Sequence, residues 1–290
     1  MITRESLMDD LHRIGVSKGD VLYVSADLSR IFFDERSSTI FPQLSAREIV
    51  DLLLFVVGDK GTLVAPAFTS SNFGVFGNAN LFFNGKTLST SGVLSNEMLT
   101  HPDHMRSNHP THSFVAIGAV SEQLLHGHSC QSETYLPVRK MIRYNAKQIR
   151  IGTMNTTPGF VTVHFAEQTL LLDKLVIFPW LNNVYIKING NLKLFRTKSR
   201  GLCSKQQWRL FSYYVKSEIL SVGRIGCAYS ILSSMSEAYD IEKDVLLNDK
   251  TLLICKNVVC VSCNARRWDR LHRMPLWIII KIIKKILRLH

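Results

Sequence analysis

Helical and strand patterns alternate along the first 66 residues, and this order constrains the fold more than any other feature of the chain. Apolar residues fall on one face of a helix over residues 3–14, which a glycine ends. A short apolar run at 21–24 is typical of a strand buried on both faces. Residues 45–57 begin with a Ser-x-x-Glu capping box and predict a second helix, and 61–66 predict a second buried strand. This succession of elements indicates an α/β fold.

The rest of the chain continues the pattern without an internal repeat or a low-complexity linker. Further strands are expected at 114–118 and 148–152, helices at 92–100 and 161–172, a long loop at 70–90, and a hairpin at 185–195 that turns at Asn189-Gly190. We therefore expect a single compact α/β domain over residues 1–265, with a central mixed sheet flanked by helices. Residues 266–290 are expected to form a basic amphipathic C-terminal tail.

Composition excludes several other classes of protein. Of the 290 residues, 46% are hydrophobic and 20% are charged, which rules out a disordered chain, a collagen-like repeat and a disulfide-stapled mini-protein. The polar, acidic N-terminus lacks the apolar segment of a signal peptide. The six cysteines are therefore expected to be reduced thiols of a cytoplasmic protein.

More than half of the formal net charge of +12 belongs to the C-terminal tail. Residues 266–290 contain eight Lys or Arg and one acidic residue, so they contribute +7. A nucleic-acid binder would carry such charge along a folded groove, so no nucleic-acid partner is expected. Residues 275–290 predict a helix, too short to span a bilayer, with four cations on one face from Lys281 onward. This helix either contacts the inner face of a membrane or docks on the core or on a second subunit of a homo-oligomer.

The densest polar cluster is the segment at 101–113, which holds four histidines within twelve positions. Histidine is a common metal ligand, but the segment has neither an HExxH motif nor the spacing of a Cys/His zinc site. We therefore expect no metal ion there. The favoured interpretation is a loop that binds phosphates of a substrate or cofactor through Arg106, Ser107 and backbone amides.

A second candidate site is the pair formed by His164 and Glu167. If residues 161–172 are helical, positions i and i+3 lie on one face. A carboxylate one turn away can hold an imidazole in one tautomer and stabilise its protonated form, as general base catalysis requires. Spacing alone does not distinguish this arrangement from an ordinary surface pair.

Three cysteines near the C-terminus, Cys255, Cys260 and Cys263, have the spacing that begins a plant-type iron–sulfur site. The flanking apolar residues predict a β-hairpin turning at Lys256-Asn257, in which Cys260 and Cys263 would face opposite sides. We therefore expect buried thiols rather than a cluster. A fourth cluster ligand would have to come from an upstream cysteine, namely Cys130, Cys203 or Cys227.

Several segments, taken in order, resemble the aminoglycoside 3-N-acetyltransferase family of antibiotic N-acetyltransferases. The most specific is the Arg-Ser-x-His-Pro-Thr-His-Ser motif at 106–113, which an Ala-Ile-Gly at 116–118 follows. The others are a Gly-x-x-x-Gly-Asp turn at 15–20, a Val-Gly-x-x-Gly-Thr-Leu-x-x-Pro-x-Phe-Thr segment at 57–69, the His-x-x-Glu at 164–167 and a weaker match at 225–228.

The resemblance implies an enzyme that moves an acetyl group from acetyl-coenzyme A (acetyl-CoA), its co-substrate, to the amine of an amino sugar. His164 would then be the general base that takes a proton from the amine, and Glu167 would orient it. Backbone amides near the 106–113 loop would stabilise the oxyanion. The resemblance also implies cofactor contacts at Ser25, Arg106, Ser107, His109 and Ser113.

The chain departs from the family pattern in two places. Where the family commonly has a histidine and serines after the first strand, this chain has Ser25-Ala26-Asp27. The stretch at 152–162 is longer and lacks the usual acidic residue, so a different amine pocket is expected. The mildly basic body favours an anionic acceptor such as a nucleotide-linked amino sugar over an aminoglycoside. The alternative hypothesis is a catalytically inactive, membrane-peripheral interaction protein on the same fold.

Overall fold

The computed structural model describes residues 2–69, 72–73, 82–153, 159–173, 182–188, 190–196, 203–258, 260–273, 275–276, 279–280 and 283. The helices are α1 (Arg4–Ile14), α2 (Leu28–Ile31), α3 (Ala46–Val57), α4 (Val93–Met98), α5 (Ser121–Leu125), α6 (Leu136–Arg143), α7 (Val161–Thr169), α8 (Phe211–Lys216), α9 (Met235–Asn248) and α10 (Val261–Asn264), with 3₁₀ helices η3 (Ser204–Leu210) and η4 (Trp268–Arg273). The strands are β1 (Val21–Ala26), β2 (Phe33–Asp34), β3 (Thr39–Ile40), β4 (Thr62–Pro66), β5 (Asn72–Phe73), β6 (Phe82–Phe83), β7 (Met105–Arg106), β8 (Phe114–Gly118), β9 (Lys147–Ile151), β10 (Asn182–Ile188), β11 (Asn191–Arg196), β12 (Ser221–Ile225) and β13 (Ala228–Ser234).

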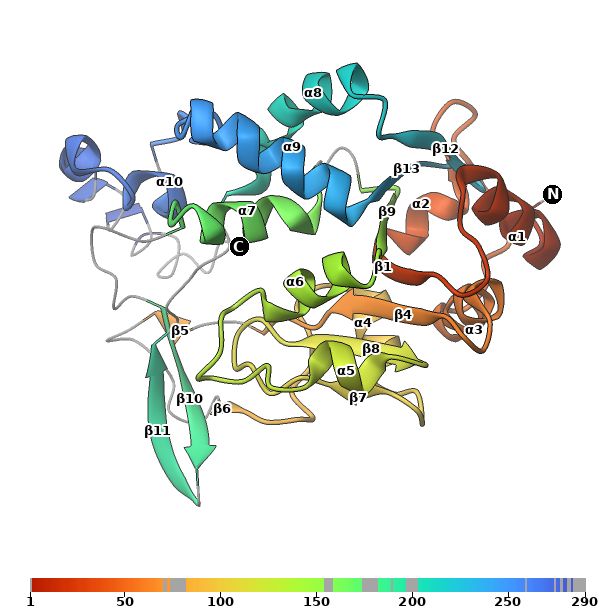
Figure 1. Ribbon diagram of the computed structural model, residues 1–290, viewed down its shortest axis with the longest axis horizontal. Coiled ribbons are helices and arrows are strands. Elements are labelled where there is room, and N and C mark those ends of the chain that lie inside the picture. Colours follow the sequence, from red (N-terminus) through yellow and green to blue (C-terminus); the bar gives the residue numbers. More distant parts are fainter. Residues whose placement is uncertain are drawn as a thin grey trace.

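A seven-stranded mixed sheet forms the centre of the molecule, with helices on both sides (Figure 1). Its strand order is β12-β13-β9-β1-β4-β8-β7. Strands β9, β1 and β4 run parallel to one another, and the outer strands are antiparallel to their neighbours. The predicted α/β fold with a central mixed sheet is confirmed.

Both faces of the sheet are covered because alternate residues of a strand point to opposite sides. On β1, Leu22 and Val24 join an apolar core with α1, α3 and α4. Val21 and Tyr23 of the same strand join a second core with α5, α6 and α7. This arrangement explains why β1 lacks the alternation of polar and apolar residues seen in surface strands.

The helix ends follow the capping signals in the sequence. The Ser45 hydroxyl accepts a hydrogen bond from the Glu48 amide at 3.2 Å, and the Glu48 carboxylate accepts one from the Ser45 amide at 2.7 Å. The predicted capping box at the start of α3 is therefore confirmed. Helix α1 ends at Gly15, whose left-handed φ of 110° favours glycine.

The carboxyl ends of β1, β4 and β9 meet at one edge of the sheet, which is where parallel α/β sheets usually bind ligands. The antiparallel β8 begins at the same edge, because Phe114 pairs with Pro66 at the end of β4. The segment at 107–113, which joins β7 to β8, therefore reaches this edge. The chain also leaves β9 here on its way to α7. The segments with the predicted site residues thus converge.

Three expectations for the outer segments have different outcomes. The hairpin predicted at 185–195 is confirmed by β10 and β11, which extend away from the central sheet (Figure 1). Residues 70–90, expected to be a loop, contain the short strands β5 and β6, which pair with β10. The β-hairpin predicted around Lys256-Asn257 is wrong. The chain there makes turns and irregular backbone, and α10 begins at Val261.

The basic helix predicted at 275–290 lies mostly outside the described residues. Those described there are 275–276, 279–280 and 283, and they are helical. The boundary between 265 and 266 stays a prediction, as does the amphipathic tail. Among the described residues, no helix combines the length and apolar character needed to cross a bilayer.

Candidate functional site

His164 and Glu167 lie one turn apart on α7. The Nδ1 atom of His164 is 3.0 Å from Oε2 of Glu167. The His164 side chain keeps 17% of its surface exposed, whereas that of Glu167 keeps 2%. A carboxylate in contact with Nδ1 keeps the proton on that nitrogen and leaves Nε2 as the proton acceptor. The helix predicted from the pattern is confirmed, and it brings the two side chains into hydrogen-bonded contact.

Burial separates this pair from an ordinary surface contact. Desolvation raises the pKa of the Glu167 carboxyl, while the hydrogen bond from His164 and the charge of Arg266 oppose the rise. Arg266 also donates a hydrogen bond to the carbonyl of Leu172, just beyond α7. A hydrogen bond in such a low-dielectric setting is stronger than one at the surface. The carboxylate therefore constrains the ring more firmly than the spacing alone implies.

The other ring nitrogen of His164 faces Gln207 on η3, with 3.4 Å between the two Nε2 atoms. Gln207 is buried. A glycine makes room for it, since a Cβ at Gly159 would lie 2.2 Å from Oε1 of Gln207. With Nδ1 protonated, the Gln207 amide is the donor and the Nε2 lone pair of His164 the acceptor. No sequence pattern around Gln207 pointed to this contact.

Tyr135, at the N-terminus of α6, connects the two predicted sites. Its ring stacks on that of His164, with 5.8 Å between centroids and 22° between planes. It also meets the ring of His112 edge-on, with 5.5 Å between centroids. The hydroxyl of Tyr135 is buried and has no hydrogen-bond partner in the described part of the chain. Tyr135 was not among the predicted site residues. The nearest signal in the sequence is Pro137, which indicates the start of a helix but no functional role.

Ser107 and His109 belong to a buried network inside the 106–113 loop. The Ser107 hydroxyl accepts from the Phe114 amide at 2.8 Å and lies 2.9 Å from Nδ1 of His128. The His109 ring stacks on that of His128 at 4.9 Å and meets Phe195 of β11 edge-on at 5.5 Å. Both residues are almost fully buried. Both side chains stabilise the conformation of the loop through these internal contacts. Cofactor binding by either stays a prediction.

Arg106 and Ser113 join the loop to neighbouring chain segments. Arg106 Nε donates to Ser113 Oγ at 3.1 Å, and Nη2 donates to the Ala67 carbonyl at 3.0 Å. Nη1 donates to the carbonyls of Gly85 and Thr87. Burial lowers the pKa of Arg106 to about 10, so the side chain is cationic at neutral pH. Its hydrogen-bond partners in the described part of the chain are all neutral oxygens, so none of them balances its positive charge.

Ser25 lies near the carboxyl end of β1, half-buried and in register with Arg150 of β9. Arg150 is buried and donates to Thr153 Oγ1 at 2.9 Å and to the Gly159 carbonyl. Ser25 therefore shares the sheet edge with the segment that leads to α7, and no hydrogen bond between Ser25 and the 106–113 loop is observed among the described residues. Its cofactor contact stays a prediction.

The backbone amides expected to form the oxyanion hole are largely engaged within the protein. Those of Thr111 and His112 donate to Nδ1 of His109, and that of Asn108 donates to the His128 carbonyl. The Ser107 and Phe114 amides also have partners. These bonds weaken the case for the loop amides as oxyanion donors, because each would have to be exchanged when a ligand binds.

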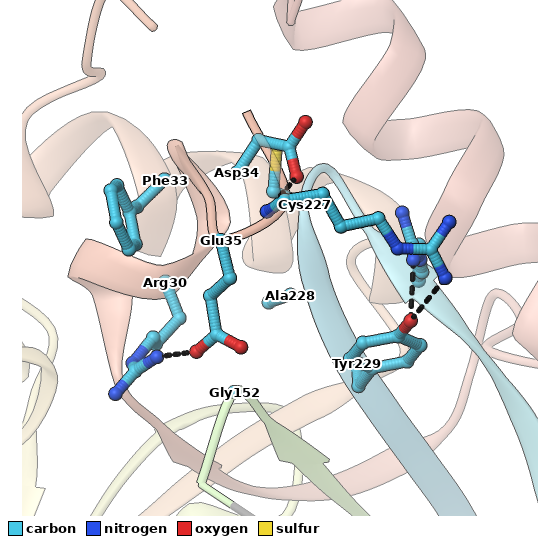
Figure 2. A pocket seen from close by; sticks show the side chains of 10 residues that line it. Arg30, Phe33, Asp34, Glu35, Gly152, Cys227, Ala228 and Tyr229 are labelled. Atoms are coloured by element: carbon cyan, nitrogen blue, oxygen red, sulfur yellow. Dashed lines mark hydrogen bonds and ion pairs between the residues drawn. The ribbon is translucent and has the colours of Figure 1, made fainter. Parts of the chain in front are cut away.

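A separate pocket of about 140 Å³ lies between the β2 region and the β12–β13 hairpin (Figure 2). Its walls include Arg30 and Glu35, which form an ion pair, and Arg224, which donates to the Tyr229 hydroxyl at 2.6 Å. None of the predicted site residues lines it. The volume is also below the ~300–1,000 Å³ of typical ligand sites, so this pocket is not the candidate active site.

Comparison with known proteins gives a family match over most of the chain. A family model described as aminoglycoside 3-N-acetyltransferase matches residues 37–247. The chain is 22% identical over 275 residues to the SPbeta prophage-derived aminoglycoside N(3')-acetyltransferase-like protein YokD of Bacillus subtilis (strain 168), covering 88% of this chain and 96% of that protein. It is 26% identical over 183 residues to aminoglycoside N(3)-acetyltransferase III of Serratia marcescens, covering 58% of this chain and 64% of that protein.

Solved structures show the same fold. The apoenzyme of aminoglycoside acetyltransferase AAC(3)-IVa superposes with a TM-score of 0.72 at 20% identity, covering 92% of this chain and 96% of that one. A binary complex of AAC-IIIb with CoASH superposes with a TM-score of 0.65 at 22% identity, covering 85% and 96%. At these identities the superpositions establish the architecture.

Proposed function

The chain belongs to the aminoglycoside 3-N-acetyltransferase family, and we propose that it acetylates an amine of an amino sugar with His164 as general base and Glu167 as its orienting acid. As a member it is a coenzyme A-dependent N-acyltransferase with acetyl-CoA as co-substrate. The family match does not by itself establish the base, its partner or the identity of the acceptor, and these are the parts that we propose.

The proton balance assigns a role to each ring nitrogen of His164. An amine attacks a thioester only when its nitrogen lone pair is free, so the reaction needs a group that removes its proton. In the proposed mechanism the Gln207 amide gives up its contact with Nε2 of His164 when the amine binds. Nε2 then takes the amine's proton, while Glu167 stabilises the imidazolium through Nδ1. The new amide C–N bond forms, the thioester C–S bond breaks, and the proton passes to the departing thiolate of coenzyme A.

The observation that supports this proposal most directly is the ring contact between Tyr135 and His164. Through His112, the same tyrosine touches the motif that is most specific for the family. The general-base pair and the 106–113 loop are thus parts of one site at the carboxyl edge of the sheet. A surface His–Glu pair with no catalytic role would not require this convergence.

Arg106 and Ser25 are the proposed contacts with the co-substrate. The Arg106 guanidinium donates to neutral oxygens among the described residues, so its charge can attract the phosphates of coenzyme A. Ser25 adds a hydroxyl at the same edge of the sheet. Ser107, His109 and Ser113 are proposed to act by holding the loop in shape, since each is buried among internal partners.

An acetylation assay tests the proposal and identifies the acceptor. The full chain is incubated with acetyl-CoA and a panel of aminoglycosides and nucleotide-linked amino sugars, and the released thiol of coenzyme A is followed. The proposal expects thiol release that depends on an amino sugar, with mass spectrometry showing a singly acetylated product. Thiol release no faster than without an acceptor across the panel would contradict it.

A further inference from the structure

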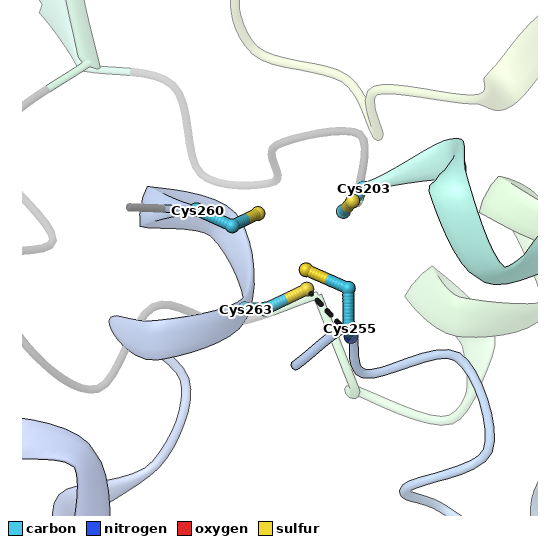
Figure 3. Close-up of side chains that lie close together, drawn as sticks. All are labelled: Cys203, Cys255, Cys260 and Cys263. Carbon is cyan, nitrogen blue, oxygen red and sulfur yellow. Dashed lines mark hydrogen bonds between the residues drawn. The ribbon is translucent and has the colours of Figure 1, made fainter. Parts of the chain in front are cut away.

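Four cysteines from two distant parts of the chain meet beside η3. Their sulfur atoms, those of Cys203, Cys255, Cys260 and Cys263, all lie within 4.8 Å of one another (Figure 3). Cys255 and Cys263 are buried, and the other two are half-buried. None of them forms a disulfide.

Local structure explains how three of these thiols come close to one another. Cys260 precedes α10 and Cys263 lies within it, so the two are separated by one helical turn and share a side. The backbone amide of Cys255 donates to the sulfur of Cys263 at 3.3 Å. The side-chain amide of Asn264 donates to the carbonyls of Asn257 and Val258 at 3.1 and 2.9 Å, which holds the connecting turn.

We propose that these four cysteines bind a single structural zinc ion. Zinc takes four thiolates in a tetrahedron with Zn–S bonds of about 2.3 Å, which places the sulfur atoms about 3.8 Å apart. Four sulfur atoms that all lie within 4.8 Å of one another fit one ion after small side-chain adjustments. Cys260 and Cys263 also have the Cys-x2-Cys spacing that commonly supplies two of the four ligands of a structural zinc site.

The same geometry argues against an iron–sulfur cluster. In a cluster the cysteines bind different iron atoms, so some of their sulfur atoms stand on opposite sides of a multi-atom core. Here no pair is that far apart. The earlier expectation of buried thiols assumed that Cys260 and Cys263 lie on a strand and face opposite ways, and α10 removes that objection.

Two cations around the cluster suit a centre with net negative charge. Four thiolates and one Zn²⁺ leave a charge of −2. Arg270 donates to the Cys255 carbonyl at 2.9 Å, and Arg266 follows Cys263 by three residues. Metal sites usually include hydrogen bonds and charges from residues that surround the ligands.

The proposed ion would tie the C-terminal segment to the active site. Cys203 directly precedes η3, which carries Gln207, the residue that faces His164. Cys263 lies three residues before Arg266, which contacts the end of α7. A positioning role for the ion therefore rests on the proposed function, whereas binding of the ion does not.

Metal analysis of the purified full chain tests the site without any assay of activity. We expect about one zinc per chain by elemental analysis, and a tetrahedral cobalt–thiolate spectrum after exchange with Co²⁺. Four of the six thiols per chain should become reactive only after a chelator removes the zinc. Iron with inorganic sulfide, or a chain that holds no zinc even after reconstitution, would overturn the proposal.

Two pairs of variants distinguish the site from adventitious binding. Cys203→Ser and Cys260→Ser should lower the zinc content to well below half an equivalent and abolish the cobalt spectrum. Cys130→Ser and Cys227→Ser, at cysteines outside the cluster, should keep one zinc. Equal zinc loss in both pairs would refute the assignment. If a cluster variant does not fold, the cobalt spectrum and thiol count of the unmodified chain still decide the question.

Discussion

The ring of Tyr135 lies against the ring of His164, with 5.8 Å between centroids and 22° between planes. This contact holds the imidazole from a side that Glu167 does not reach, because the carboxylate contacts only its Nδ1 edge. Gln207 meets the opposite nitrogen. Three neighbours from α6, α7 and η3 thus determine where the imidazole points, and each can be tested separately.

Replacing Tyr135 should affect catalysis through its ring and not through its hydroxyl. Tyr135→Leu removes the surface that stacks on His164, so we expect kcat to fall at least several-fold. Tyr135→Phe should keep most of the activity and match or exceed the wild-type melting temperature, because the hydroxyl is buried without a partner in the described structure. A large loss of kcat in Tyr135→Phe would show instead that the hydroxyl contacts the substrate.

Gly159→Ala should reduce activity by displacing Gln207. The added Cβ would lie 2.2 Å from Oε1 of Gln207, so the buried amide must leave its place beside His164. We expect a lower kcat with little change in the KM for acetyl-CoA. Gly223→Ala on β12 is the matched control, since its added Cβ would meet only Ile14, at 3.6 Å or more. Equal kinetics for both variants would exclude a role for the Gln207 contact.

Glu242 should make the protein less stable as the pH rises. Its Oε1 accepts hydrogen bonds from Thr162 at 2.9 Å and Tyr214 at 2.6 Å, and burial raises its pKa well above the ordinary value. The folded chain keeps the proton where the unfolded chain loses it, so stability declines above the ordinary carboxyl pKa. Glu242→Gln should therefore raise the melting temperature at pH 8 and change it little at pH 4. If the melting temperatures of Glu242→Gln and of the unmodified chain differed by the same amount at every pH in this range, the burial argument would be contradicted.

His128 should make the protein less stable as the pH falls. Burial lowers the pKa of His128 to about 4 and that of the stacked His109 to about 2. Both rings stay neutral in the folded chain, whereas in the unfolded chain they take up protons below about pH 6.5. Stability should drop between pH 6.5 and 4, by up to about 1.4 kcal/mol per pH unit per ring. Urea unfolding of His128→Gln should show a shallower drop, and an unchanged slope would refute this assignment.

The fold could be predicted from sequence because its elements follow local periodicity. Val21–Val24 is apolar throughout, which marked β1 as buried on both faces, and the Ser45–Glu48 box marked the start of α3. The His164–Glu167 contact followed from helical spacing. Each of these features depends on residues within a few positions of one another.

The parts that sequence analysis missed depend on contacts between distant segments. Tyr135 and Gln207 stand 29 positions before and 43 positions after His164, and only the packing of α6 and η3 on α7 brings them together. The valines around Cys260 favoured a strand by propensity, but hydrogen bonds from Asn264 hold the segment in a turn and helix. The meeting of Cys203 with the other three thiols has no local signal at all.

The central claim is that His164 takes the proton from the attacking amine, and a comparison of His164→Ala with the unmodified chain tests it most directly. Acetylation of the accepted amino sugar is measured as kcat/KM, with circular dichroism as the check on folding. A general base contributes about 10²–10⁴-fold, so we predict a loss of that size in a folded variant. A folded His164→Ala chain that keeps more than a tenth of the activity would contradict the account, and an unmodified chain that acetylates nothing would favour an inactive interaction protein.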